Sequence, residues 1–250
     1  MSGELVSLRA LLVCGSERDC ERLRKGAAQA VLPFEIEQAD SAGKAQALLE
    51  RGGIDLVLID SAIAQPDCAR VVTAARAGTK PALAIMLGGS GASAAGADAV
   101  TPMPIDQRDA TGLFDRCARA RMPSRVMVVD DSSTMRMIVR KILSASRFPL
   151  DISEADDGAA CLYRVRRGGI DVVFLDYNMP GLDGIATLHE LKRADPTVDV
   201  VLMTSTQDQV LADRAIHAGA RAFLKKPFYT AAVDALLFAR CGLTPCQTAG

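Results

Sequence analysis

The chain has 250 residues, of which 49% are hydrophobic and 24% are charged, and its formal net charge is −1. This composition is typical of a globular protein, and the near-neutral charge gives no electrostatic reason to expect a nucleic acid or an anionic membrane as partner. The apolar start "LRALLVCG" is too short for a membrane segment and is interrupted by Arg9, so we expect no membrane insertion and a cytoplasmic location.

The first half of the chain alternates short apolar runs with longer amphipathic stretches. The runs are "RALLVCG" at 9–15, "FEIEQAD" at 34–40, "DLVLIDS" at 55–61, "ALAIMLGG" at 82–89 and "ADAVTPMP" at 97–104. Each run predicts a buried strand that is followed by a helix. The stretch "GGSGASAAGA" at 88–97 is a poor helix sequence, so we expect the fourth helix of this half to be short or missing.

The second half repeats the same alternation. Its predicted strands are "VMVVDD" at 126–131, "LDISEA" at 150–155, "DVVFLD" at 171–176, "DVVLMTS" at 199–205 and "AFLKKPF" at 222–228. Between the first two, residues 134–143 place Ile138, Val139, Ile142 and Leu143 on one helical stripe, which predicts a core-facing helix. We count five strands and five helices in this half.

Alternating strands and helices indicate parallel sheets that are covered on both faces. We therefore predict the α/β class, with two flavodoxin-like doubly wound (βα)5 domains and the parallel sheet order 2-1-3-4-5. The expected boundaries are 1–121 for the first domain and 125–240 for the second, followed by a frayed tail at 241–250.

An internal repeat supports the division into two domains. "RGGIDLVLID" at 51–60 returns as "RGGIDVVFLD" at 167–176, and seven of eleven positions from Glu50 to Asp60 recur 116 residues later. A repeat of this period is long enough for each copy to form its own core. Duplication is therefore the first structural prediction.

Polar residues follow the strands of the second half where each strand ends. They are Asp130, Asp131, Asp176, Thr204 and Lys226. The carboxyl ends of parallel strands meet at one edge of a sheet, so these side chains should converge. Three carboxylates that lie close together repel one another unless a cation is present, and hard oxygen ligands suit Mg²⁺. A lysine and a threonine beside them can hold the oxygens of a phosphoryl group.

This set of residues, with "DYNMPGLDG" after the third strand and "KPF" at the last one, resembles the receiver domain of two-component response regulators, especially the chemotaxis type. The resemblance covers residues 125–240. It implies that Asp176 accepts a phosphoryl group from a sensor histidine kinase or a histidine phosphotransfer protein. It further implies that Asp131 and Asp176 bind Mg²⁺ directly, together with the backbone carbonyl of Asn178, and that Asp130 acts mainly through water.

The same resemblance assigns three further roles. Lys226 would pair with the phosphoryl oxygens, and Thr204 would move to hydrogen-bond them. Phe223, three residues before Lys226, would be the switch aromatic residue that turns inward on activation. The Lys226–Pro227 bond would be cis, which an X-Pro bond allows at small cost.

The first half lacks most of these residues. When the two halves are aligned with a shift of 116 residues, Asp130, Asp131 and Thr204 correspond to Cys14, Gly15 and Gly88. Alignment through the prolines places Met103 at Lys226 and Val100 at Phe223, so only Asp60 survives. A lone carboxylate has neither counter-charge nor donor, so we predict that Asp60 is not phosphorylated and that this half resembles a degenerate receiver.

Several functions remain open at this point. The first is a tandem receiver without an effector domain, which signals by phosphorylation-gated binding of a downstream protein in chemotaxis, motility or a phosphorelay. The alternative is a scaffold or dimerisation protein that is not phosphorylated, and a homodimer is possible in either case. A haloacid-dehalogenase-like phosphatase would need a DxD pattern at the first strand, which is absent. A shortened diguanylate cyclase or transcription factor is also conceivable.

The seven cysteines are odd in number, and no two of them have CxxC spacing. A disulfide or zinc framework is therefore not expected, and we interpret the cysteines as buried or incidental thiols.

Overall fold

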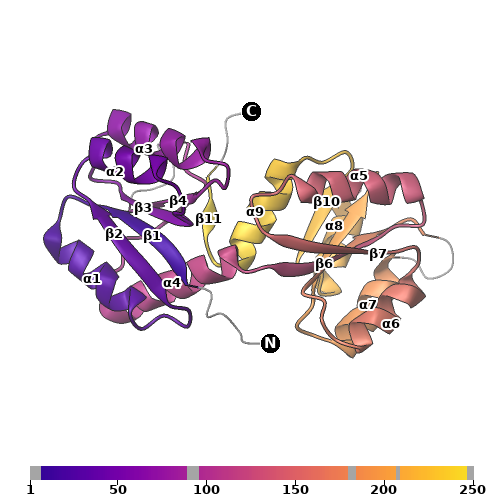
Figure 1. Cartoon of the computed structure of the whole chain (residues 1–250). Helices are drawn as coiled ribbons and strands as arrows, with labels where there is room; N and C mark the ends of the chain where they lie inside the picture. Colours follow the sequence, from indigo (N-terminus) through magenta and orange to yellow (C-terminus); the bar gives the residue numbers. More distant parts are fainter. Residues whose placement is uncertain (1–6, 89–95, 180–183, 207–208, 247–250) are drawn as a thin grey trace, which may run out of the picture. The chain divides into compact units, whose positions relative to one another are not determined.

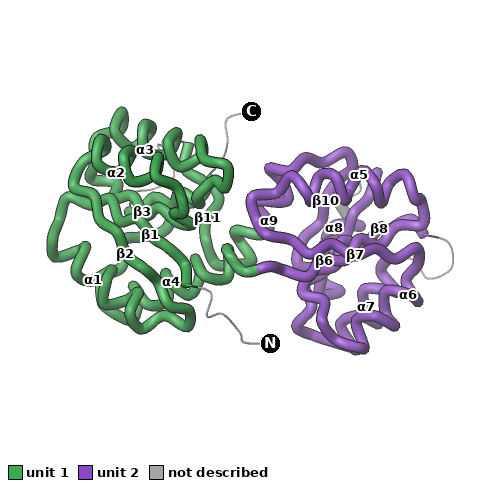
Figure 2. Tube along the Cα trace, in the orientation of Figure 1, with its two compact units in different colours: residues 1–122, 237–250 green, residues 123–236 purple. Residues whose placement is uncertain are grey.

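The computed structural model describes residues 7–88, 96–179, 184–206 and 209–246. The chain forms two compact units, coloured separately in Figure 2. The first unit comprises Met1–Met122 and Leu237–Gly250, and the second comprises Pro123–Leu236. Among the described residues no helix combines the length and the apolar character that crossing a bilayer requires.

The second unit is a five-stranded parallel sheet with helices on both faces. Its strands are β6 (Ser124–Val129), β7 (Leu150–Ala155), β8 (Val172–Asp176), β9 (Asp199–Thr204) and β10 (Ala222–Lys225), in the spatial order β10-β9-β8-β6-β7. Its helices are α5 (Ser133–Ser144), α6 (Gly158–Arg166), α7 (Gly184–Ala194), α8 (Gln209–His217) and α9 (Thr230–Arg240). The predicted α/β class and the order 2-1-3-4-5 are confirmed for this half.

The helices of the second unit divide between the two faces of the sheet. On one face α6 and α7 pack against each other, and with α8 they cover the core around Val129, Leu175 and Leu202. On the other face lie α5 and α9 (Figure 1). They meet where Thr230 Oγ1, at the start of α9, donates to the carbonyl of Ile142 at 3.2 Å. The central strand β8 is buried along its whole length because helices cover both faces of the sheet, whereas the edge strand β7 carries charged residues and is only partly buried.

The first unit repeats this plan. Its parallel strands are β1 (Leu8–Val13), β2 (Phe34–Ala39), β3 (Leu56–Asp60), β4 (Leu83–Leu87) and β5 (Ala99–Thr101), in the order β5-β4-β3-β1-β2. Its helices are α1 (Glu17–Ala27), α2 (Ala42–Glu50), α3 (Gln65–Ala77) and α4 (Gln107–Arg121). In Figure 1, α1 and α4 lie on one face of the sheet, and α2 and α3 lie on the other.

Residues 241–246, the described part of the expected frayed tail at 241–250, are ordered against the first unit. Thr244 and Pro245 form β11, which pairs antiparallel with Val100 and Ala99 of β5. The preceding residue Leu243 is buried, so this segment completes both the sheet and the core of the first unit. The outer edge of β5 would otherwise leave backbone N–H and C=O groups unpaired, and β11 pairs with this edge. The second unit accordingly ends at Leu236, inside α9, rather than at residue 240.

Two smaller expectations have different outcomes. The stretch where we expected a short or missing helix includes residues 89–95, which lie outside the described residues. On α5, Val139 is buried as expected, but the side of the helix that carries Ile138 is not, and Ile138 is 44% exposed. The prediction of a buried stripe is wrong at Ile138, because a helix on a sheet buries a narrower face than the apolar pattern suggests.

The repeated "RGGID" forms the turn that leads from the second helix of each unit into its third strand. Gly52 and Gly53 have φ angles of 75° and 80°, and Gly168 and Gly169 have 76° and 94°. These left-handed conformations are accessible to glycine without strain. A Cβ at Gly53 would also lie 2.4 Å from the Arg9 guanidinium, so any larger residue there would have to displace the end of that flexible side chain.

The aspartate of the motif anchors the start of the first strand in each unit. Asp55 accepts a hydrogen bond from the backbone N–H of Arg9 at 3.0 Å, and Asp171 accepts one from the backbone N–H of Arg125 at 2.7 Å. Asp171 also pairs with the Arg125 guanidinium at 2.9 Å. The motif therefore recurs because each unit needs the same hydrogen bond between this turn and the start of its first strand.

Asp55 should stabilise the first unit in a pH-dependent way. Burial raises the pKa of its carboxyl, but hydrogen bonds from Lys80 and the Arg9 backbone, with the charges of Lys80 and Arg121, outweigh burial and lower it. The stabilisation is therefore present above the ordinary value of 3.8 and is lost as the pH falls through the folded-state pKa. We expect Asp55→Asn to lower the unfolding free energy by about 1–2 kcal/mol at neutral pH.

Urea denaturation over a pH series measures this effect, and the difference from wild type should disappear in acid. Glu21→Gln is the control, because the ion pairs of Glu21 with Arg24 and Lys25 lie on the exposed surface of α1 and should contribute little. A pH-independent loss in Asp55→Asn would contradict the electrostatic account.

Candidate functional site

Polar side chains gather at the carboxyl edge of the second sheet. Asp176 and Thr204 are the last residues of β8 and β9, and Asp130 and Lys226 directly follow β6 and β10. The parallel register, in which Asp176 lies opposite Met203, brings these strand ends to one level. Sequence reasoning placed all four residues at this edge.

The Lys226 ammonium lies between two buried carboxylates. Its Nζ is 2.6 Å from Asp130 Oδ2 and 2.9 Å from Asp176 Oδ1. Asp130 is 1% exposed and Asp176 is 5% exposed, so neither charge is screened well by water. A charge-assisted hydrogen bond to each compensates for much of the cost of burying them.

Asp131 completes a group of three carboxylates. Asp130, Asp131 and Asp176 each have an oxygen within 4.8 Å of the others. Asp131 is exposed, so the group faces solvent through this residue. Three convergent carboxylate oxygens are the donors that a hard divalent cation takes, and they fit Mg²⁺ in a site that keeps water ligands. Asn178 follows two residues after Asp176 and is exposed, and residues 180–183 beyond it lie outside the described part of the loop.

Backbone contacts hold the loop after β6 in place. Asp130 Oδ1 accepts from the backbone N–H of Ser132 at 3.0 Å, and the Ser132 hydroxyl in turn accepts from the backbone N–H of Met135 at 3.4 Å and so caps the start of α5. Arg136 donates to the backbone carbonyl of Asp130 at 2.8 Å and pairs with Glu154 at 3.3 Å. Sequence reasoning missed Arg136, because its distance of one helical turn from the loop carries no signal of its own.

Thr204 and Phe223 lie on neighbouring strands next to this group. Thr204 is fully buried, and its Oγ1 accepts a hydrogen bond from the backbone N–H of Thr206 at 3.1 Å. Its carbonyl accepts from the backbone N–H of Lys226 at 2.7 Å, which links the ends of β9 and β10. Phe223 lies opposite Leu202 and packs, partly buried, against the core. The Lys226–Pro227 bond is cis, as the resemblance implies.

The electrostatics of the site favour a neutralised acceptor carboxyl. Burial raises the pKa of Asp176, and although Lys226 opposes this, the Asp130 and Asp131 carboxylates add to the rise. Burial lowers the pKa of Lys226, but its bonds to Asp130 and Asp176 outweigh burial and raise it. Since the folded state holds the Asp176 proton more tightly, ionising Asp176 costs stability as the pH rises above the ordinary value of 3.8. A bound cation beside Asp176 would relieve that cost.

Gly184, the first residue of α7, allows this helix to approach the acceptor strand. A Cβ at this position would lie 2.7 Å from the carbonyl oxygen of Asp176 and from the Cα of Tyr177. Its backbone N–H donates to the carbonyl of Tyr177 at 3.1 Å. The second glycine of "MPGLDG" is therefore required for a close approach rather than only for a turn.

Comparison with known proteins agrees with this geometry. Residues 126–237 match the response regulator receiver domain. The chemotaxis protein CheY of Bacillus subtilis is 35% identical over 107 residues, which cover 43% of this chain and 88% of that protein. The chain belongs to the response regulator receiver family. The chemotaxis protein CheY of Thermotoga maritima is 31% identical with the same coverage of both chains. Membership places the chain among the response regulators of two-component signalling.

A solved two-component response regulator/GGDEF domain protein extends the similarity to both units. It aligns with 93% of this chain and 98% of its own, with a TM-score of 0.53 and 21% identity. At that identity the likeness shows only the fold, which the two units share; we call them the first and the second receiver for this fold, while the family match itself covers residues 126–237. Receiver domains generally bind Mg²⁺ at an acidic pocket, and the three aspartates of the second receiver form such a group.

The first receiver has a different set of residues at the equivalent edge. Strand register places Val100 opposite Met86 just as Phe223 lies opposite Leu202, so Met103 takes the place of Lys226. Asp60 is buried and accepts from the backbone N–H of Ala62 at 2.9 Å. Among the described residues of this unit no three metal-ligating side chains lie close together.

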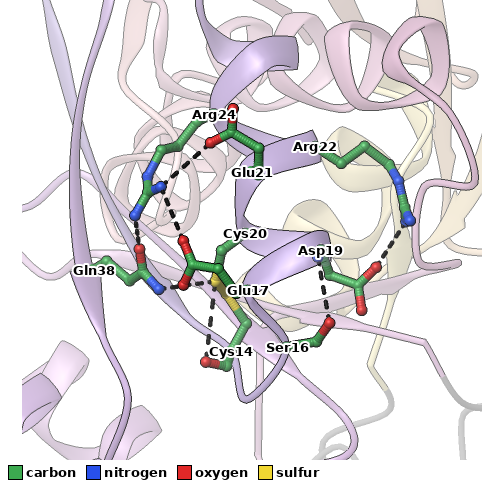
Figure 3. Close-up of a disulfide and its surroundings, with 9 residues drawn as sticks. All are labelled: Cys14, Ser16, Glu17, Asp19, Cys20, Glu21, Arg22, Arg24 and Gln38. Carbon is green, nitrogen blue, oxygen red and sulfur yellow. Dashed lines mark hydrogen bonds and ion pairs between the residues drawn. A yellow bond between two sulfur atoms is a disulfide. The ribbon is translucent and has the colours of Figure 1, made fainter.

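Cys14, at the position of Asp130, forms a disulfide with Cys20 (Figure 3). The expectation that the cysteines are unpaired thiols is wrong for these two. Cys20 lies in the first turns of α1, which brings it back over the end of β1, and the Cα atoms are 6.4 Å apart. Spacing along the sequence did not reveal this, because the contact depends on the angle at which the helix leaves the strand. Cys68, Cys117, Cys161, Cys241 and Cys246 are free.

Lys226→Met tests the charge balance of the second receiver with the residue that the first one has at this position. Loss of the ammonium leaves two buried carboxylates without a counter-charge, so we expect the unfolding free energy to fall by about 3 kcal/mol at neutral pH without metal. The loss should shrink near about pH 4, where carboxyl groups begin to take up protons. Urea denaturation measures both values.

Lys225→Met is the matched control, because Lys225 is the exposed neighbour on β10. It should change stability by less than about 0.5 kcal/mol. An equal fall in unfolding free energy in the two variants would show that replacing either lysine at this end of β10 is destabilising, and that the ion pair of Lys226 is not the cause.

Proposed function

We propose that the protein is a response regulator that accepts a phosphoryl group on Asp176 from a histidine kinase or a histidine phosphotransfer protein and signals by binding another protein. The observation that supports this most directly is the contact of Lys226 with both Asp130 and Asp176, beside a third carboxylate. This arrangement provides a nucleophile, a counter-charge and a cation site in one place.

The chemistry is attack of an Asp176 carboxylate oxygen on the phosphorus of a phosphohistidine. The new P–O bond makes an acyl phosphate, the P–N bond breaks, and its electron pair leaves with the imidazole. Catalysis of this step consists mainly of positioning and of neutralising negative charge. Lys226, already 2.9 Å from Asp176, would pair with the transferred oxygens.

Asp131 and Asp176 would hold Mg²⁺ directly, the Asn178 carbonyl would be the third protein ligand, and Asp130 would act through water. The ion supplies charge neutralisation for the transferred group when it is bound. Asp130 would remain bound to Lys226 and so keep the ammonium close to the acceptor.

Phosphorylation would change the population of the Thr204 and Phe223 arrangements. The added charge favours any conformation that brings donors to it. The Thr204 hydroxyl can be such a donor, because its bond from the backbone N–H of Thr206 uses the oxygen and not the hydroxyl proton. Partly buried Phe223 lies on the adjacent strand and would turn inward in the space that Thr204 leaves.

The output surface would lie around α8, β10 and α9. Large apolar side chains are exposed there: Val210 by 66%, Ile216 by 49% and Tyr229 by 72%. Large exposed apolar side chains in and next to these elements favour a protein partner. Proteins of this family act in chemotaxis, motility and phosphorelays, and we propose such a pathway for this protein.

A homodimer is a further proposal, and light scattering with and without phosphoryl donor would detect it.

Phosphotransfer from acetyl phosphate with Mg²⁺ tests the acceptor assignment, with intact mass as the readout. Wild type should gain one phosphoryl group, and Asp176→Asn should gain none. Asp60→Asn is the matched control, because Asp60 is the corresponding buried aspartate of the first receiver, and it should label like wild type. Labelling that depends on Asp60 alone would reverse the two roles, and absence of labelling in wild type would favour the unphosphorylated scaffold.

Thermal unfolding with increasing Mg²⁺ tests the cation site separately. A ligand at about 100 times its Kd stabilises a folded protein by about 2.7 kcal/mol, so the second receiver should melt several degrees higher. Asp131→Ala should remove the shift. Asp156→Ala should keep it, because Asp156 is exposed at the end of neighbouring β7 and lies outside the three-carboxylate group. A shift that survives Asp131→Ala would place the ion elsewhere.

A further inference from the structure

In the first receiver a covalent bond links the end of β1 to α1. Cys14 directly follows β1, and Cys20 lies on α1, six residues later. Both residues are buried, with exposures of 4% and 0%. Figure 3 shows Gln38 of β2 beside the bond, and its Nε2 lies 3.2 Å from Cys20 Sγ. The bond therefore lies at the carboxyl edge of the sheet, among three elements.

The second receiver links the same three positions without a covalent bond. A shift of 116 residues relates Cys14, Cys20 and Gln38 to Asp130, Arg136 and Glu154. The register agrees, since Val13 lies opposite Ala39 and Val129 lies opposite Ala155. There Arg136 donates to the Asp130 carbonyl and pairs with Glu154. The receiver fold is therefore complete with only polar contacts at these positions.

We propose that Cys14 and Cys20 are a reversible dithiol–disulfide pair, and that the first receiver responds to thiol redox state at the edge equivalent to the acidic site of the second. The pair is a modification site that is independent of phosphoryl transfer to Asp176. Oxidation fixes the loop between β1 and α1, and reduction releases it.

The reaction is exchange with a dithiol. A thiolate of the reductant attacks one of the two sulfurs, the Cys14–Cys20 bond breaks, and the leaving thiolate takes a proton. The second thiol of the reductant then displaces the remaining cysteine and closes its own disulfide. Two electrons and two protons pass to the protein, and the reductant is oxidised. The reverse reaction uses a small disulfide as oxidant.

The surroundings allow both states. After reduction, Cys20 Sγ still has the Cys14 carbonyl oxygen at 4.0 Å as an acceptor and the Gln38 amide as a donor. Gln38 is itself held by Arg24, so the donor stays in place. Because both sulfurs are buried, a reagent reaches them only when the loop of Gly15 and Ser16 opens, and exchange should be slower than at an exposed pair.

Peptide mapping tests the proposal on the full chain. The protein is equilibrated, folded, in oxidised or reduced dithiothreitol, its thiols are alkylated, and it is digested with trypsin. Arg18 lies between the two cysteines, so the oxidised form yields "ALLVCGSER" linked to "DCER", and the reduced form yields both peptides alkylated. We expect the linked pair to convert fully and reversibly, while the other five cysteines are alkylated in both conditions.

Two outcomes would overturn the proposal. In the first, the linked peptide does not form under oxidising conditions. In the second, the linked peptide forms but persists when the folded protein is held in reduced dithiothreitol, so that the bond is structural only.

Thermal unfolding provides the second readout. Opening a bond that closes so short a loop should lower the melting temperature of the first receiver by roughly 5 °C. The double variant Cys14→Ser, Cys20→Ser should melt at one temperature in both conditions. Cys246→Ser, which removes a partly exposed free cysteine of the same unit, should keep the redox-dependent difference. A shift that persists in the double variant would assign the response to other cysteines and refute the proposal.

Discussion

Two carboxylates buried at the edge of a parallel sheet repel each other unless a cation lies between them, and in the second receiver Lys226 is that cation. Its position depends on the fold. Asp130 and Asp176 lie on adjacent strands, and Lys226 reaches them from β10, two strands beyond β8 in the sheet. Burial, together with repulsion from the neighbouring carboxylates, raises the pKa of Asp176 and makes the site receptive to a further positive charge. The buried charges account for the chemistry that the site can perform.

Much of this arrangement could be predicted from the sequence, because it follows from strand periodicity. Apolar runs that end in polar residues predict both the sheet and the edge at which Asp130, Asp176, Thr204 and Lys226 meet. The degenerate edge of the first receiver could be predicted in the same way, and strand register places Met103 where alignment through the prolines had placed it.

What could not be predicted depends on the angles between elements or on pairing between distant segments. The bond between Cys14 and Cys20 requires the direction in which α1 leaves β1. The pairing of β11 with β5 joins residues far apart in the sequence, and two residues of strand have no detectable periodicity. The exposure of Ile138 depends on how α5 is rotated against the sheet. Local patterns contain none of this information.

The order of the strands along the chain has a consequence for biosynthesis. The first receiver leaves the ribosome first, but β11 is translated only after the whole second receiver. Until then the outer edge of β5 has no partner, and domains made early generally fold as units during synthesis. The half that is made first is thus the last to be finished, and a nascent chain stalled before Thr244 would expose an open sheet edge to its neighbours.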